Sequence, residues 1–141
     1  MAQTVQQALT NAKLYSDELP YRFIALPSNA ITVAAGIIAE ASVPFSALLI
    51  DKDEVTLMIP DEVCDEFKNR LKYATVSDTI YRLITFDIVL ESTLVGFMAH
   101  ITQALADANI SVMPFAAYSR DHIFVSEADY DKAVTTLKAL Q

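Results

Sequence analysis

The sequence predicts an α+β fold made of two βαββα units in tandem, with antiparallel sheets that carry their helices on one face. The same order of strand, helix, hairpin and helix occurs twice, over residues 19–78 and 79–141. Short matches recur at corresponding places, and these are Arg22-Phe23-Ile24 with Arg82-Leu83-Ile84, and Ser42-Val43-Pro44-Phe45 with Ser111-Val112-Met113-Pro114-Phe115. We therefore expect an internal duplication that follows a helical segment over residues 1–18.

The leading segment is expected to be a short helix. Val5, Leu9 and Ala12 recur at helical spacing through residues 3–14, and Ser16-Asp17-Glu18-Leu19-Pro20 ends this pattern.

In the first unit the apolar pattern alternates between strand spacing and helix spacing. The predicted elements are a strand at 21–26, a helix at 30–41 capped by Ser28 or Asn29, a hairpin of 45–50 and 55–59, and a helix from Pro60 to Tyr73. Residues 75–77 can add a short fourth strand.

The second unit repeats this order. It has a strand at 82–90, a helix capped by Ser92 or Thr93 that ends near Asn109, a hairpin of 110–118 and 122–125, and a final helix after the capping box Ser126-Glu127-Ala128-Asp129. No fourth strand is evident before Gln141.

Composition excludes several classes of protein. The 141 residues are 53% hydrophobic, which is too apolar for a disordered chain, and a net charge of -8 argues against nucleic acid and anionic membranes as partners. The longest apolar stretch, residues 30–43, is too short and too polar to span a bilayer. We expect a cytoplasmic protein, because a signal peptide is not evident and the single Cys64 leaves no intramolecular disulfide.

No established catalytic or metal-binding motif occurs. Glycine is present at positions 36 and 96 alone, which excludes a glycine-rich phosphate loop. We therefore expect no enzyme activity, no cofactor and no metal site.

Three side chains still have to be weighed against that expectation. Cys64 lies beside an apolar stripe, so a structural thiol is favoured over a nucleophile. His100 is expected on a solvated helix face. His122 follows Asp121 at a hairpin tip, where the pair could orient a polar ligand, although a charged turn is the simpler reading.

The link from the strand at Asp87 into the following helix is the better candidate for a site. Free backbone N–H groups at a helix start suit a carboxylate, and Gly96 permits a close approach. An ordinary capped helix start would have the same sequence, so spacing alone leaves both readings open.

The second unit resembles an ACT domain, a ferredoxin-like βαββαβ regulatory module that binds amino acids. The residues that carry the resemblance are 83–86, 92–96, 104–112 and 121–125. The chain is similar in particular to proteins with tandem ACT-like units that are related to CASTOR-type arginine sensors and to aspartokinase regulatory regions.

The resemblance implies a non-catalytic regulatory module with a small-molecule amino acid ligand. Backbone donors at 93–96 would hold the ligand carboxylate, and Asp121 or Glu91 would hold its ammonium or a basic side chain. The implied ligand-binding residues are Leu90, Glu91, Ser92, Thr93, Leu94, Val95, Gly96, Phe115, Ala116, Ala117 and Asp121.

The sequence departs from the ACT pattern in two places, the first loop of the first unit and the last strand of the second unit. The loop 27–30 could form a second site or only an interface, but Gly36 falls inside the helix and does not match Gly96. A missing fourth strand leaves an open edge, so we expect pairing into a larger sheet within one chain or in a homodimer. The alternative function is a ligand-free interaction or structural protein.

Overall fold

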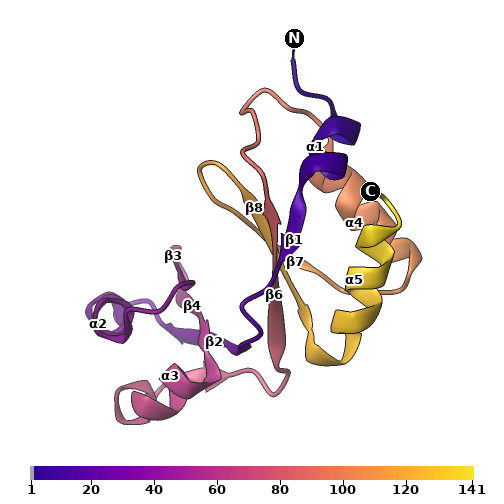
Figure 1. Ribbon diagram of the computed structural model, residues 1–141. Coiled ribbons are helices and arrows are strands. Elements are labelled where there is room, and N and C mark those ends of the chain that lie inside the picture. The colour runs from indigo at the N-terminus through magenta and orange to yellow at the C-terminus, as the bar shows by residue number, and fades with distance from the viewer. Residues whose placement is uncertain (1) are drawn as a thin grey trace. The chain divides into compact units, whose positions relative to one another are not determined.

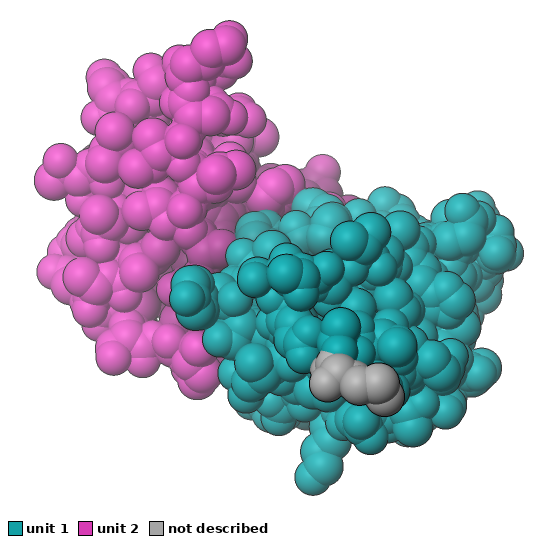
Figure 2. Space-filling view, turned by 90° about the horizontal axis from the view of Figure 1, so that it is seen from above, with its two compact units in different colours: residues 1–18, 82–141 teal, residues 19–81 magenta. Residues whose placement is uncertain are grey.

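The computed structural model describes residues 2–141, and the chain divides into two units (Figure 2). Unit 2 is the segment 19–81, and unit 1 joins the N-terminal segment, up to Glu18, to residues 82–141. The leading segment, which the sequence suggested as a separate stretch, therefore belongs to the same unit as the C-terminal half.

Unit 2 contains one antiparallel sheet. Its elements are β2 (Pro20–Pro27), α2 (Ile31–Ala41), β3 (Ala47–Ile50), β4 (Glu54–Pro60), α3 (Asp61–Glu66), the 3₁₀ helix η1 (Lys68–Leu71) and β5 (Thr75–Val76). The strand order is β3-β4-β2-β5. This confirms the predicted order of elements and the short strand expected at 75–77.

The two helices of unit 2 cover one face of its sheet. Ile24 and Leu26 of β2 alternate with more exposed neighbours and pack in one cluster with Ile37 of α2 and Val63 of α3. Full burial of such a side chain stabilises the fold by about 1.5 to 3 kcal/mol.

The helix predicted from Pro60 to Tyr73 is shorter in the structure. The α-helix ends at Glu66, and a tighter 3₁₀ turn over Lys68–Leu71 follows. Leu71 is still buried, because it packs in the same cluster as Val63. The guanidinium of Arg70 lies over the Phe67 ring at 5.1 Å.

The strands of unit 1 follow the order β1-β6-β8-β7. Its elements are α1 (Val5–Asn11), β1 (Lys13–Tyr15), β6 (Tyr81–Asp87, whose first residue lies in unit 2), α4 (Phe97–Asp107), β7 (Met113–Ala116), β8 (Asp121–Ser126), the 3₁₀ helix η2 (Glu127–Asp129) and α5 (Tyr130–Lys138).

The strand β1 was not expected from the sequence. The leading helix ends at Asn11 rather than near Leu14, and Leu14 pairs with Phe86 of β6. The helical spacing of the early residues hid this change, because Ala12 fits both a helix and the extended chain that follows. The open edge expected in the second unit is thus covered by the N-terminal segment of the same chain.

Three helices cover one face of the sheet in unit 1. Figure 1 shows α1, α4 and α5 on the same side of β6 and β8. Leu9, Ile101 and Leu137 from these helices pack in one buried cluster with Ile84 and Ile123 from the strands. The α+β fold with antiparallel strands and helices on one face is therefore as the sequence predicts.

Several element ends differ from prediction around the loop between β6 and α4. The strand β6 ends at Asp87 instead of Leu90, and α4 begins at Phe97 instead of near Thr93. The end of α4 is as expected, since Asn109 adopts φ 59° and the Ile110 N–H donates to the Leu105 carbonyl at 2.9 Å. No helix within residues 2–141 is both long enough and apolar enough to cross a bilayer.

Candidate functional site

The loop 88–96 leaves the sheet at Asp87 and is held by backbone hydrogen bonds. The Ile88 N–H donates to the Phe86 carbonyl at 2.8 Å, which turns the chain away from the sheet. The Leu90 N–H donates to the Ser119 carbonyl at 2.8 Å. The loop is therefore tied to the turn between β7 and β8.

Gly96 ends this loop and begins α4. Its φ is +92°, a backbone conformation that costs an L-residue about 1 to 2 kcal/mol and costs glycine little. The positive φ is the structural reason for glycine at this position. A Cβ here would lie 4.0 Å from Val5 Cγ2, an ordinary contact, so the backbone conformation and not a close approach within the chain requires glycine.

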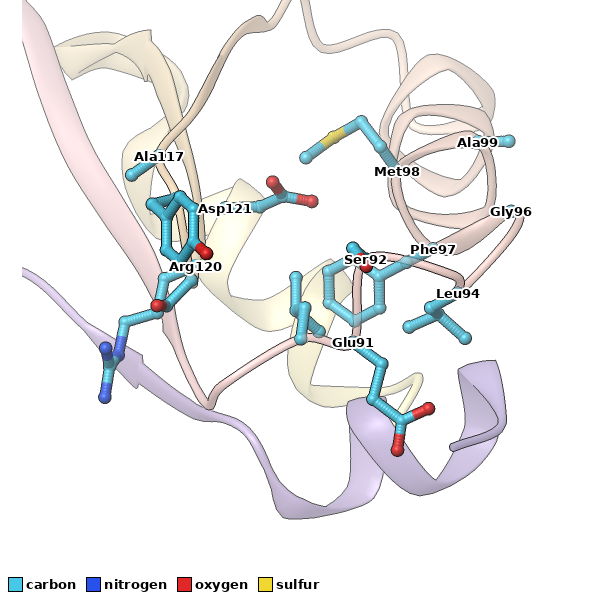
Figure 3. Close-up of a pocket in the computed structure, with 13 residues that line it drawn as sticks. Glu91, Ser92, Leu94, Gly96, Phe97, Met98, Ala99, Ala117, Arg120 and Asp121 are labelled. Carbon is cyan, nitrogen blue, oxygen red and sulfur yellow. The ribbon is translucent and has the colours of Figure 1, made fainter. Parts of the chain in front are cut away.

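A cavity of about 340 Å³ lies between the start of α4 and the turn after β7 (Figure 3). Loop 88–96, the first turn of α4 and the β7–β8 turn all contribute to its wall. The lining residues are Leu90, Glu91, Ser92, Leu94, Gly96, Phe97, Met98, Ala99, Ala117, Tyr118, Ser119, Arg120 and Asp121.

The first turn of α4 provides backbone donors at the cavity. Phe97, Met98 and Ala99 line it, and the first N–H groups of a helix have no carbonyl acceptor within the helix. In the described chain no side chain caps this end, and the first turn carries no acidic residue. Neither the cap nor the first turn of α4 compensates the positive end of the helix dipole, and such a helix end favours an anionic group.

Asp121 is the carboxylate that points into the cavity. Figure 3 shows the Asp121 side chain directed toward Met98 in the first turn of α4. Burial raises the pKa of the Asp121 carboxyl, and the charge of His122 opposes this shift. The ionised carboxylate is thus poorly solvated, and a cation beside it would be stabilising.

Glu91 and Arg120 line the cavity but turn their charged groups away from it (Figure 3). The Glu91 carboxylate accepts a hydrogen bond from the Gln3 N–H at 3.1 Å. The Arg120 guanidinium donates from Nε to Asp87 Oδ1 at 2.9 Å. Asp121 rather than Glu91 is therefore the carboxylate that faces the cavity.

The structure gathers most of the residues that the resemblance implied. Leu90, Glu91, Ser92, Leu94, Gly96, Ala117 and Asp121 line the cavity, whereas Thr93, Val95, Phe115 and Ala116 do not. Phe115 instead packs edge-on against Phe124, with ring centroids 5.5 Å apart.

Sequence reasoning missed the first turn of α4 and most of the β7–β8 turn. The helix was expected to begin before Gly96, so Phe97, Met98 and Ala99 were assigned to its interior. The signal in the sequence for the observed start of α4 was Gly96 followed by the apolar residues Phe97 and Met98. The turn was expected at 119–121, but the Ala117 N–H already donates to the Arg120 carbonyl at 2.9 Å.

The side chains considered for catalysis lie apart from the cavity wall. His122 Nδ1 is 2.7 Å from the Thr85 hydroxyl, and burial lowers the pKa of this imidazole. Burial raises the pKa of the Cys64 thiol, and Asp61 and Asp65 raise it further. His100 is exposed, as predicted. Among residues 2–141, no group of three or more His, Cys, Asp or Glu could hold a metal ion.

Unit 2 has a smaller cavity at its corresponding loop. Its volume is about 200 Å³, and Asn29, Ala30, Arg70 and Tyr73 contribute to its wall. Arg70 Nη1 donates to Glu40 Oε2 at 2.5 Å, so the guanidinium already has an anionic partner.

The model of the ACT domain family matches residues 76–139, the region that contains the larger cavity. This match, together with the antiparallel sheet and its helices, supports the ACT ferredoxin-like fold. No curated protein sequence matches the chain. The relation to CASTOR-type sensors and the tandem ACT arrangement stay predictions.

Solved structures of similar fold include proteins of known and unknown role. A protein of unknown function from Vibrio cholerae, described as a possible transport protein, is 22% identical with a TM-score of 0.75, covering 96% of this chain and 94% of that one. The regulatory subunit of aspartate kinase from Thermus thermophilus is 16% identical with a TM-score of 0.67, covering 92% and 97%.

A third similar structure is the aspartate kinase from Clostridium acetobutylicum, described as an allosteric enzyme. It is 20% identical with a TM-score of 0.65, and the match covers 93% of this chain and 34% of the kinase. At these identities the likeness shows the fold alone.

Proposed function

We propose that the chain is a non-catalytic regulatory module that binds a free amino acid in the cavity of unit 1. The ACT match and the aspartate kinase neighbours support a regulatory, ligand-binding module in general. The observation that carries the finer proposal is the pairing of a bare helix start with Asp121 across one cavity.

These two features suit the two charges of an amino acid. The ligand carboxylate would accept hydrogen bonds from the N–H groups of Phe97, Met98 and Ala99, which the helix itself leaves free. The ligand ammonium would pair with Asp121, the carboxyl whose pKa is raised by burial beside the cavity. The side chain of the ligand would contact Leu90, Leu94 and Met98.

The relay of ligand occupancy is proposed to occur through association with a second copy or another protein. Val89 and Val95 in the site loop are 58% and 87% exposed, and Tyr118 on the facing turn is fully exposed. Apolar side chains of this kind beside a cavity are suited to an interface. Ligand binding that reshapes the loop would change this surface.

A thermal-unfolding screen against the twenty amino acids tests the proposal. A ligand that binds the folded state alone stabilises it by about 2.7 kcal/mol at a hundredfold excess over its Kd. We expect one amino acid or a chemically related group to raise the Tm, and Asp121→Asn to reduce that shift at the same ligand concentration. Saturating concentrations of every amino acid without a shift would contradict it.

The second candidate function is a homodimer or complex that needs no ligand. The exposed Val89, Val95 and Tyr118 favour it independently of the cavity. Sedimentation of Val95→Ser and Tyr118→Ser variants tests this candidate. Association that these changes weaken, and that Asp121→Asn and amino acids leave unaltered, would select the ligand-free function.

A further inference from the structure

Gln3 joins the N-terminal segment to the site loop by three hydrogen bonds. Its backbone N–H donates to Glu91 Oε2 at 3.1 Å, and the Glu91 N–H donates to Gln3 Oε1 at 3.0 Å. Gln3 Nε2 also donates to the Val89 carbonyl at 3.2 Å. The side chain of each residue therefore accepts a hydrogen bond from the backbone N–H of the other.

The segment that begins at Gln3 is itself anchored in unit 1. Thr4 closes a capping box with Gln7 at the start of α1, and Leu9 of that helix is buried in the unit 1 cluster. The strand β1 then pairs with β6, with Lys13 opposite Asp87. Asp87 is the last residue of β6 before the site loop.

The same segment thus contacts the site loop at its start, its middle and its end. Lys13 pairs with the residue from which the loop departs, and Gln3 holds Val89 and Glu91. At the far end, a Cβ on Gly96 would lie 4.0 Å from Val5 Cγ2, so α1 borders the start of α4.

We infer that Gln3 is a positioning residue for the candidate site, through which the docked N-terminal segment holds loop 88–96 in the shape that opens the cavity. The inference rests on the proposed function for its biological meaning, because the loop forms one wall of the proposed ligand site. Docking of the segment and ordering of the loop are then linked, and each stabilises the other.

Amide hydrogen exchange of the ligand-free protein tests this inference. The Leu90 and Leu94 N–H groups donate to the Ser119 and Glu91 carbonyls, and both acceptors remain in a Gln3→Ala variant. Faster exchange at these amides therefore reports a looser loop. We expect exchange about tenfold faster in Gln3→Ala, as for the loss of one or two net hydrogen bonds.

Gln6→Ala is the matched control. Gln6 Nε2 donates to Thr10 Oγ1 at 3.1 Å and to the Leu140 carbonyl at 3.5 Å, and neither acceptor belongs to the loop. Exchange at Leu90 and Leu94 is expected to stay unchanged in this variant. An equal acceleration in both variants would overturn the inference.

Glu91→Ala tests the contact from the opposite side. Linkage predicts faster exchange of the Gln7 and Ala8 amides, which are bonded to Thr4 at the start of α1. Unchanged exchange there, with an effect in Gln3→Ala confined to the Glu91 amide, would overturn the inference and leave Gln3 as a surface contact.

The amino acid identified by thermal unfolding gives an independent readout. We expect its Kd to rise about tenfold in Gln3→Ala and to stay unchanged in Gln6→Ala. A screen in which no amino acid stabilises the protein would contradict the proposed function, whereas the exchange of Leu90 and Leu94 would still decide the role of Gln3.

Discussion

The two units place different loops between their first strand and first helix. In unit 2 the link from Pro27 to Ile31 is the three residues 28–30, and the cavity beside it is about 200 Å³. In unit 1 the link from Asp87 to Phe97 is the nine residues 88–96, and the cavity is about 340 Å³. The same order of elements therefore carries a short link beside the smaller cavity and a long link beside the larger one.

The two units also differ in the environment of one hairpin carboxylate, Asp51 in unit 2 and Asp121 in unit 1. Asp51 Oδ1 in unit 2 accepts hydrogen bonds from the Asp53 and Glu54 N–H groups, and these bonds lower the pKa of Asp51. Burial raises the pKa of Asp121 in unit 1. The Asp51 carboxylate bonds the backbone of its own turn, whereas Asp121 lines the cavity in which we propose that it pairs with a ligand ammonium.

The largest expected effect is on ligand binding. Asp121→Asn removes the charge that would pair with the ligand ammonium, and a hydrogen bond to a charged group contributes about 1.5 to 3 kcal/mol. We expect binding of the amino acid identified by the screen to weaken about 10- to 100-fold, measured by calorimetry. Asp51→Asn should leave the affinity unchanged, and equal effects of the two variants would abolish the distinction between the units.

The next largest effect concerns the two glycines. Gly96→Ala keeps ordinary space around the new Cβ but imposes φ +92° on alanine, so we expect a loss of about 1 to 2 kcal/mol in the free energy of unfolding. Gly36→Ala lies inside α2, where alanine should stabilise by about 0.5 to 1 kcal/mol. Urea unfolding of both variants gives the comparison, and changes of the same sign would contradict it.

A smaller effect on stability is expected from changes near the short strand that each unit adds to its hairpin and first strand, β1 in unit 1 and β5 in unit 2. Unit 1 takes this strand from the N-terminal segment, so weakening the start of α1 should destabilise the protein. Thr4→Ala removes the cap of that helix, and we expect a loss of about 1 kcal/mol. The exposed Thr75 in β5 is the control, because Thr75→Ala should stay within about 0.5 kcal/mol. A Thr4→Ala variant as stable as the wild type in urea would show that the helix cap does not matter for docking.

The smallest effects are on the pH dependence of stability, and the two carboxylates should give opposite signs. The pKa of Asp121 is raised in the folded state, so its stabilising contribution is present below the unfolded pKa and is lost as pH rises through the folded pKa. The pKa of Asp51 is lowered, so its contribution is present above the unfolded pKa and is lost as pH falls through the folded pKa.

Urea unfolding of Asp121→Asn and Asp51→Asn from pH 3 to pH 7 measures these signs. Relative to the wild type, Asp121→Asn should gain stability as pH rises, whereas Asp51→Asn should lose it. A flat difference for both variants would mean that neither carboxyl changes its pKa on folding.

Much of the fold could be predicted because local pattern and global packing agree. The alternation of Ile24 and Leu26, and the helical spacing of Ile101 and Leu105, place apolar side chains on the faces that the structure buries. The candidate loop could be located because a strand pattern ends and a helix pattern begins on either side of it, although its true limits, Asp87 and Phe97, were not predicted.

Other features depended on contacts between distant residues. Lys13–Tyr15 is a strand because β6 offers it an edge with Phe86 opposite Leu14, and no local signal in the sequence reports that edge. Glu91 and Asp121 are both acidic residues beside turns, yet Gln3 binds one of them and leaves the other facing the cavity.

The sequence by itself determined the order of most strands and helices and the faces they bury, because each depends on residues close together in the chain. The tertiary structure decided which segment completes the sheet of unit 1 and which carboxylate meets the cavity. Both follow from pairings between Gln3 or Leu14 and residues more than seventy positions away. Such pairings are selected by packing of the folded chain and leave no periodic mark on the sequence.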